Sequence, residues 1–284
     1  MTSPSGYRVV ILGDSWVRGL LFERRHPFGK LIAEGINASE VLDLSAQSRT
    51  TVDVVSCHLG SIGSFRPDVA IVNIGGADSL IFPRAALQRL VERWVPMKHH
   101  GARGWMPPAS YSSKPYKRAK QRATHIVRIV MKQVLVNLFG GQRRVSVPEF
   151  ERAAETLFDY LQAHDVLMVV VGFGPVDGLY SPKTNASVEA TNSVLRTLCL
   201  AHSNALYIGT GHFLRQWDDY LADHVHLNAQ GHQRVAAEVL KVLEREKLPW
   251  SDLPVGSQAK PNVKVSPPRR QGATSPRGCH KWSR

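Results

Sequence analysis

The stretch Val9-Val10-Ile11-Leu12-Gly13-Asp14-Ser15 decides the fold of this chain. Its apolar run has the composition of a strand that is buried on both faces of a parallel sheet. Open α/β sheets place their functional sites at the carboxyl ends of such strands, where Gly13, Asp14 and Ser15 follow here. These three residue types also form ordinary turns, so the stretch alone does not make Ser15 a nucleophile. It predicts an α/β fold with Ser15 at the functional edge of the sheet.

Further strands alternate with helices along the chain. Short apolar runs predict strands at residues 41–44, 68–74, 166–172 and 206–208. Helical periodicity or capping residues predict helices at 28–37, 83–94, 188–202 and 228–246, and helices that open at Thr51 and Ser146. This alternation is typical of a three-layer α/β/α sandwich with a five-stranded parallel sheet. We expect the flavodoxin-like strand order 2-1-3-4-5.

The chain of 284 residues is long enough for one large domain with a substantial core. Residues 95–147 interrupt the strand-helix alternation, and residues 251–284 lack periodicity and are rich in Pro, Ser, Lys and Arg. We therefore predict a single α/β domain over 1–250, with a basic helical insertion at about 95–147 and a disordered basic tail over 251–284.

The cysteines indicate a reducing compartment. Cys57, Cys199 and Cys279 are odd in number and scattered, and they fit neither a disulfide framework nor a zinc site. Residues 1–7 lack the apolar core of a signal peptide, and no apolar run is long enough to span a membrane. We expect a cytoplasmic protein with no cofactor, no metal site and no transmembrane segment.

The positive charge is concentrated in particular segments of the chain. The formal net charge is +13, and no acidic residue lies between Glu92 and Glu149. Nucleic acid, anionic lipid headgroups and phosphate-bearing acyl donors could all bind such a surface. No helix-turn-helix, zinc module or aromatic stacking platform is visible, so a nucleic-acid partner is not expected.

Residues 116–139 of the insertion have the pattern of a basic amphipathic helix. Lys120, Arg128 and Lys132 lie opposite an apolar face made by Ala119, Ala123, Ile126, Val127, Val130 and Val134. Three interpretations remain open. The helix is structural with a solvated basic face, it is a lid whose apolar side forms an acyl-chain pocket over Ser15, or it lies on an anionic membrane surface.

A candidate base stands just before the final predicted helix, in Asp223-His224-Val225-His226. An aspartate three residues before a histidine can fold back to hydrogen-bond the imidazole, which fixes its tautomer for proton abstraction. His224 and His232 are competitors, but only His226 has an aspartate at this offset. The alternative is that Asp223 caps a turn and His226 is a surface residue. With Ser15, these residues predict a nucleophile, a base and an orienting acid.

Three blocks together resemble the SGNH hydrolase superfamily, also called the GDSL lipases and esterases. They are Gly13-Asp14-Ser15, Gly75-Gly76-Ala77-Asp78 and Asp223-x-x-His226, and the resemblance covers about residues 7–248 without the insertion. The resemblance implies an acyl-serine mechanism on esters, with Ser15 as nucleophile, His226 as base and Asp223 as its orienter. It also implies an oxyanion hole made by the serine N–H, a glycine N–H after the second strand and an asparagine side chain after the third.

The sequence departs from this pattern at the oxyanion hole. Ser48, or alternatively Ala46, stands where the resemblance places the glycine, and Ala77 stands at the asparagine position. Gly76 and Asp78 keep their places in the block, and we expect Asp78 to fix the loop. Loss of one oxyanion donor typically lowers the rate by about 10²–10³-fold. We therefore expect the oxyanion and substrate-binding side to comprise Ser48, Gly76, Ala77 and Asp78, and to be one donor short.

Residues 75–80 and the Arg- and Trp-containing insertion also resemble the actinobacterial diglucosylglycerate octanoyltransferases, although that branch tends to have alanine where Gly13 stands. The main expectation is ester hydrolysis or O-acyl transfer on a carbohydrate or other small hydroxylated substrate. The partner is a small-molecule acyl ester or acyl donor, and both a neutral and an anionic donor stay open. One alternative is transfer of a medium acyl chain to a glucosylglycerate-like sugar. Another is a catalytically weak carbohydrate-binding module. Peripheral membrane contact also stays open.

Overall fold

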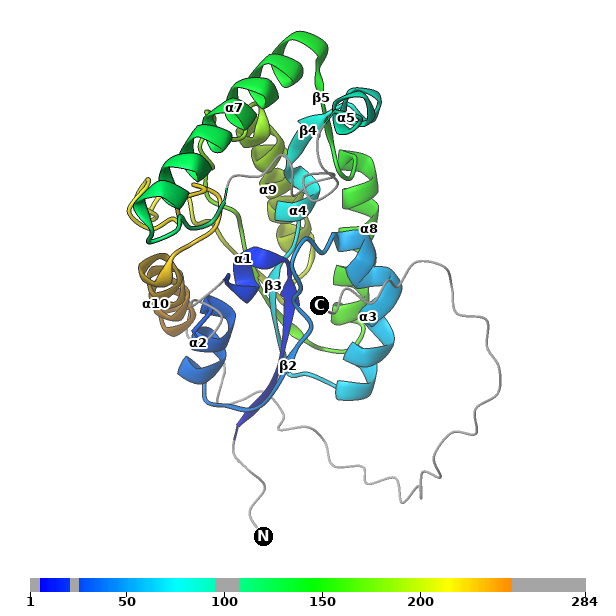
Figure 1. Ribbon diagram of the computed structural model, residues 1–284. Helices are drawn as coiled ribbons and strands as arrows, with labels where there is room; N and C mark the ends of the chain where they lie inside the picture. The colour runs from blue at the N-terminus through cyan, green and yellow to red at the C-terminus, as the bar shows by residue number, and fades with distance from the viewer. Residues whose placement is uncertain (1–5, 21–25, 95–107, 247–284) are drawn as a thin grey trace, which may run out of the picture. The chain divides into compact units, whose positions relative to one another are not determined.

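A five-stranded parallel sheet forms the centre of the protein. The computed structural model describes residues 6–20, 26–94 and 108–246 (Figure 1). The strands run in the order β2-β1-β3-β6-β7, which is the predicted order 2-1-3-4-5. Their bounds are Ala38–Asp43 for β2, Tyr7–Gly13 for β1, Val69–Asn73 for β3, Leu167–Val171 for β6 and Ala205–Ile208 for β7.

The central strands are buried on both faces, as their unbroken apolar runs predict. Every residue of β3 is buried, and so are the last five of β1. β1 pairs with β3 in a register that places Gly13 opposite Asn73. The segments that follow these two strands, with Ser15 and Gly76 in them, therefore leave the sheet side by side at its carboxyl edge.

Helices cover both faces of the sheet, so the predicted three-layer architecture is confirmed. Alternate strand residues, including Val10 and Leu12 of β1, pack in one hydrophobic cluster with residues of α3 (Thr51–Phe65), α8 (Val147–Gln162) and α9 (Thr184–Ala201). On the opposite face, a Cβ at Gly29 would touch Ile11, which places α2 (Phe28–Gly35) there. α10 (Ala229–Arg245) packs against α2, and Figure 1 shows these two helices together.

The segment between β3 and α8 contains a second, smaller sheet. A two-stranded antiparallel sheet joins β4 (Ile81–Pro83) to β5 (Gly141–Arg143), with Pro83 opposite Gly141. Two helices, α5 (Ala85–Glu92) and α7 (Pro115–Phe139), lie in the segment that this sheet closes. Residues 95–107 and the predicted tail 251–284 lie outside the described residues, so the predicted domain limits stay predictions.

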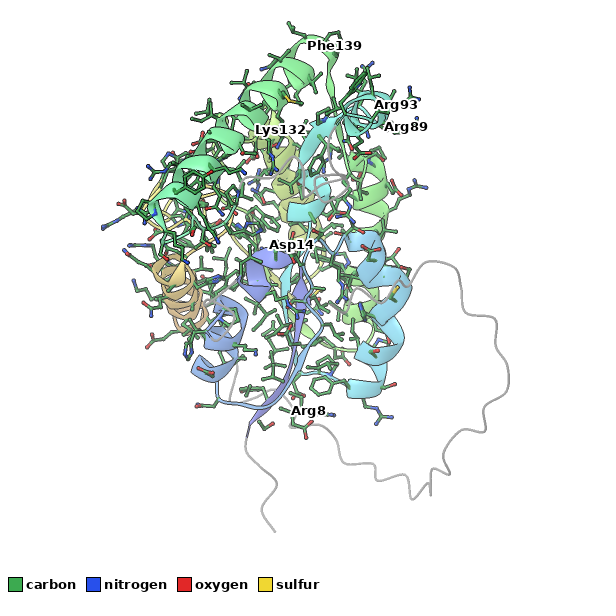
Figure 2. All side chains as sticks on the ribbon, in the orientation of Figure 1. Arg8, Asp14, Arg89, Arg93, Lys132 and Phe139 are labelled. Atoms are coloured by element: carbon green, nitrogen blue, oxygen red, sulfur yellow. The ribbon has the colours of Figure 1, made fainter. Side chains whose placement is uncertain are left out.

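The apolar face of α7 is turned to solvent. The helix exists with nearly the expected bounds, and the residues that it buries are His125, Lys132 and Val136. The residues of the predicted apolar face are exposed, with exposed fractions of 60% for Ile126, 57% for Val127, 55% for Val130 and 44% for Val134. The interpretation with a solvated basic face does not hold for Lys132, which is buried. Figure 2 shows Lys132 on the side of α7 that faces the body of the protein. A lid whose apolar side lines an acyl-chain pocket over Ser15 is therefore not what α7 forms.

Cys199 is free and buried. Burial raises the pKa of the Cys199 thiol to about 12, so it is held as an inert, protonated thiol. None of the described helices has both the length and the hydrophobicity that are needed to cross a membrane.

Candidate active site

Ser15 is presented at the carboxyl edge of the sheet by a sharp change from strand to helix. β1 ends at Gly13, whose φ of 149° and close approach to the Asn73 carbonyl leave no room for a side chain. Asp14 then caps the short helix α1 (Ser15–Arg18), because its Oδ1 accepts a hydrogen bond of 2.8 Å from the Trp16 N–H. Ser15 is the first residue of that helix and is half-buried.

Ser15, His226 and Asp223 form one continuous chain of hydrogen bonds. Ser15 Oγ lies 2.8 Å from His226 Nε2, and His226 Nδ1 lies 2.6 Å from Asp223 Oδ2. With Nδ1 protonated, the imidazole donates to the carboxylate and accepts from the serine hydroxyl. Ser15 is 211 positions from His226 in sequence, yet the fold brings the three residues to the geometry of a nucleophile, a base and its orienter.

Asp223 is held ionised. Burial acts to raise the pKa of its carboxyl, but hydrogen bonds and the charge of His226 outweigh it and lower the pKa overall. The side chain of His226 is one donor, and the backbone N–H groups of His226 and Val225 donate to Oδ1 at 2.9 and 3.0 Å. A carboxylate fixed in this way can stabilise the imidazolium that forms when His226 takes a proton.

The two competing histidines have other partners. His224 Nδ1 lies 2.8 Å from Asp177 Oδ2. His232 Nδ1 accepts a hydrogen bond of 3.2 Å from the Phe28 N–H, and burial together with the charge of His226 lowers its pKa to about 4. Among the three histidines, only His226 contacts Ser15.

Asp14 links the serine to the block that follows β3. Its Oδ2 accepts a hydrogen bond of 2.6 Å from the backbone N–H of Ala77, in the short helix α4 (Gly76–Ser79). Burial raises the pKa of Asp14 to about 6, although the hydrogen bonds from Trp16 and Ala77 act against this. Because Asp14 uses the Ala77 N–H and the side chain is a methyl group, Ala77 has no donor left for an oxyanion.

The turn after β2 distinguishes the two candidate donors there. The Ala46 N–H donates to the Gly13 carbonyl at 3.1 Å, so it is occupied. Ser48 is exposed and has a left-handed φ of 59°, a conformation that favours glycine. No hydrogen bond from the Ser48 N–H occurs within the part of the chain that the structure describes. Of the two, Ser48 keeps a backbone donor that a ligand could use.

Asp78 and Gly76 shape the loop. Asp78 is fully buried and accepts hydrogen bonds from the Thr51 N–H at 3.1 and 3.2 Å and from its hydroxyl at 3.3 Å. Burial raises the pKa of Asp78 to about 7, with the nearby charge of Asp14 adding to the shift. At Gly76, a Cβ would collide with Phe173 and with Asp14.

The predicted cap of α3 is displaced by one residue. Thr51 is the first residue of the helix, and the cap is Thr50, in a capping box with Asp53.

Sequence reasoning missed the aromatic residues that hold the catalytic turn. Trp16 Nε1 donates to the Val225 carbonyl at 2.6 Å, which joins α1 directly to the turn between Asp223 and His226. His224 is stacked between Tyr180 and Trp217, with ring centroids 4.7 and 4.8 Å away. The proximity of Trp16 to Ser15 in sequence was the only available signal.

The model of the GDSL-like lipase/acylhydrolase family matches residues 11–234. A search of the curated proteins found no match.

Solved structures with a similar fold include several esterases. An acetylxylan esterase from Geobacillus stearothermophilus has a TM-score of 0.53 at 13% identity, over 88% of this chain and 98% of that chain. A lipase/acylhydrolase from Enterococcus faecalis has a TM-score of 0.50 at 14% identity, over 84% of this chain and 96% of that one. A psychrotrophic esterase from Pseudoalteromonas has a TM-score of 0.50 at 10% identity, over 84% and 98%. At such identities these likenesses concern the fold.

Proposed function

This chain belongs to the GDSL-like lipase/acylhydrolase family and is an SGNH-type esterase, and we propose that Ser15, His226 and Asp223 carry its chemistry. The observation that supports this most directly is the hydrogen-bonded series from Ser15 Oγ through the His226 imidazole to the Asp223 carboxylate. Each contact has the direction that the reaction needs, since the acid orients the base and the base contacts the nucleophile.

The proposed reaction proceeds through an acyl-serine. Ser15 Oγ attacks the ester carbonyl while its proton passes to His226 Nε2, and Asp223 stabilises the resulting imidazolium. The tetrahedral intermediate collapses when His226 protonates the leaving alcohol, which leaves the acyl group on Ser15. Water or a second alcohol then attacks the acyl-serine and gives up its proton to His226. The bond between Ser15 Oγ and the acyl carbon breaks as His226 returns a proton to Oγ, which releases the acid or the new ester and restores the serine. Hydrolysis and acyl transfer differ only in this last nucleophile.

Two backbone N–H groups are the proposed oxyanion donors, those of Ser15 and Ser48. Both lack a hydrogen-bond partner among the described residues. The third donor that the family resemblance implies is missing because Ala77 has no polar side chain and its N–H is bound to Asp14. We expect a lower kcat than a three-donor site would give, by about 10²–10³-fold.

A fluorophosphonate probe tests the nucleophile. The native enzyme should be labelled, Ser15→Ala should not, and Ser56→Ala on the exposed face of α3 is the matched control that should be labelled like the native protein. Labelling that persists in Ser15→Ala would reject Ser15. An absence of labelling in the native protein, combined with saturable binding of a sugar, would favour the catalytically weak carbohydrate-binding module.

We propose a carbohydrate or other small hydroxylated molecule as the substrate that carries or accepts the acyl group. A hollow of about 370 Å³ supports this proposal, because it opens beyond the carboxyl ends of β6 and β7 and has a mixed polar lining. Its polar members include Asn185, Glu189, Arg196, Tyr207, Thr210 and His212. Phe173, which also lines the hollow, packs against Trp16 beside the nucleophile, with ring centroids 5.0 Å apart.

Product analysis with an activated medium-chain ester, with and without a sugar acceptor, tests this substrate class. Acylated sugar would establish transfer, and free acid alone would establish hydrolysis. His212→Ala should lower the yield of acylated sugar and leave hydrolysis unchanged. If His212→Ala lowers neither, the hollow is not the acceptor site.

A further inference from the structure

Exposed apolar side chains gather in one part of the molecule. Twelve large apolar side chains are exposed among the described residues, and nine of them lie between residues 90 and 139. They are Leu90, Trp94, Tyr116, Ile126, Val127, Val130, Val134, Leu138 and Phe139. Scattered surface apolar residues need no explanation, but a concentration of this kind marks an interaction site.

Five of these residues form a stripe along α7, which we call the outer face: Ile126, Val127, Val130, Val134 and Leu138. Their spacing of three and four residues places them on one side of the helix. The buried residues His125, Lys132 and Val136 hold the opposite side against the body of the protein. The outer face therefore points away from the protein and is not part of its core.

The segment that carries the outer face is rich in cations and contains no acidic residue. Residues 93–148 contain twelve Lys and Arg and no Asp or Glu. Four of these cations lie exposed in the first turns of α7: Lys117, Arg118, Lys120 and Arg122. None of the four pairs with a carboxylate within the described residues. The chemistry of the surface thus combines aliphatic side chains with uncompensated positive charge.

The small β4–β5 sheet places the start of α5 near the end of α7. Pro83 is paired with Gly141, so α5 begins where α7 has just ended. Figure 2 shows Arg89 and Arg93 of the α5 region toward the same end of the molecule as Phe139. Leu90 and Trp94, with exposed fractions of 52% and 85%, extend the apolar surface there and again have arginines as neighbours in sequence.

We propose that the outer face of α7, together with Leu90 and Trp94, binds the surface of an anionic phospholipid bilayer. A basic helix with an apolar face lies in the plane of such a membrane, with its aliphatic side chains among the acyl chains and its cations at the headgroups. A second copy of this chain is a poorer partner, since two acid-free basic helices would repel each other. Nucleic acid would match the cations and leave the aliphatic residues exposed to water.

Co-sedimentation with lipid vesicles tests the proposal, and it needs no catalytic activity. The full-length protein should bind phosphatidylcholine vesicles that contain about 30% phosphatidylglycerol at least about tenfold more tightly than pure phosphatidylcholine. The triple variant Ile126→Gln, Val127→Gln, Val130→Gln keeps every charge and should lose about tenfold or more of this binding. Leu200→Gln is the matched control, because Leu200 is 90% exposed on α9 and should have no effect.

A charge variant completes the test. Lys117→Gln, Arg118→Gln, Lys120→Gln, Arg122→Gln should weaken binding to anionic vesicles about tenfold or more, whereas Lys241→Gln with Arg245→Gln on α10 should not. The proposal is overturned if the native protein does not bind anionic vesicles, or if the triple glutamine variant binds like the native protein. A native dimer that this variant dissociates, without any vesicle binding, would assign the outer face to a second copy instead.

Discussion

The two halves of the candidate active site differ in how completely they are built. On the nucleophile side, Ser15, His226 and Asp223 are joined by hydrogen bonds of 2.8 and 2.6 Å, and each side chain has the partner that its role needs. On the oxyanion side, the donor position at Ala77 has no side-chain amide, and its N–H is bound to Asp14. If the proposed roles are correct, the groups that activate the nucleophile are complete in this chain, whereas the groups that stabilise the oxyanion are one donor short.

Loss of the orienting acid should lower kcat more than any other change predicted here. Asp223→Asn keeps the shape of the side chain but removes the charge that fixes the tautomer of His226, so we expect kcat to fall by about 10³–10⁴-fold with KM little changed. Steady-state kinetics on an activated ester measure this. The matched control is Asp177→Asn, the acid of the neighbouring pair with His224, which should change kcat by less than about tenfold. Equal losses in the two variants would contradict the assignment of Asp223.

Restoring a hydrogen-bond donor at position 77 should raise kcat. Ala77→Asn places a side-chain amide where the family resemblance puts one, and we expect kcat to rise by about 10–100-fold with KM unchanged. Ala77→Asp is the control of the same shape, which offers an acceptor in place of the donor and should not raise kcat. If neither variant raises kcat, another group already occupies the role of the missing donor.

The buried acids of the oxyanion side should give an unusual pH dependence of stability. The pKa of Asp14 is raised to about 6 and that of Asp78 to about 7, so the folded protein binds protons that the unfolded chain releases above about pH 4. Their contribution to the free energy of unfolding is therefore largest at about pH 4 and decreases as the pH rises to about 7.

Urea denaturation across this pH range measures the effect. Asp78→Asn keeps an oxygen to accept from Thr51 but cannot ionise, so its free energy of unfolding should depend less on pH. Compared with the native protein, the variant should be more stable at pH 7 than it is at pH 4. Asp165→Asn, at an exposed residue just after α8, is the control that should leave the slope in place. An unchanged slope in Asp78→Asn would show that Asp78 does not titrate in this range.

The smallest effect is expected at Ser48. Ser48→Gly relieves the left-handed backbone and retains the N–H, so the free energy of unfolding should rise by about 0.5–1 kcal/mol with kcat unchanged. Ser48→Ala should leave both values unchanged. Denaturation curves combined with ester kinetics separate the two quantities. A large fall in kcat for Ser48→Gly would mean that the serine side chain takes part in the reaction.

Much of the fold could be predicted because buried parallel strands have a strong sequence signal. Apolar runs predicted a strand at each place in the main sheet, and the expected flavodoxin-like topology has the observed strand order. The signal was weakest for β2, which has no buried residue and begins three residues before the predicted range 41–44. β4 and β5 escaped because three residues each are too few for any periodicity.

Amphipathic periodicity was a weaker guide to burial. In α10 the apolar side is the buried one, with Val235 and Val239 in the core. In α7 the apolar side is exposed at Val130, whereas Lys132 on the opposite side is buried. Periodicity establishes that a helix has two faces, whereas the neighbours in the fold decide which one is covered.

In the candidate site, too, local features could be predicted from sequence and features that depend on packing could not. The spacing of Asp223 and His226 is a local property, so a single turn could be inferred from sequence. The bond from Ala77 to Asp14 joins residues 63 positions apart and depends on the register between β1 and β3, which sequence does not fix. The stack of Tyr180 and Trp217 on His224 depends in the same way on how separate loops pack.

The β4–β5 pair has an evolutionary consequence. Because Pro83 lies opposite Gly141, the excursion between them starts and finishes at almost the same point of the scaffold. The entropy of closing a loop grows slowly with its length, by about 0.6 kcal/mol for each doubling, so the scaffold tolerates excursions of very different size there. A segment inserted between these two residues can therefore be replaced without moving the rest of the sheet. Related proteins could carry a different segment in place of α5 and α7, and so bind a different surface, while the strands that position Ser15 stay unchanged.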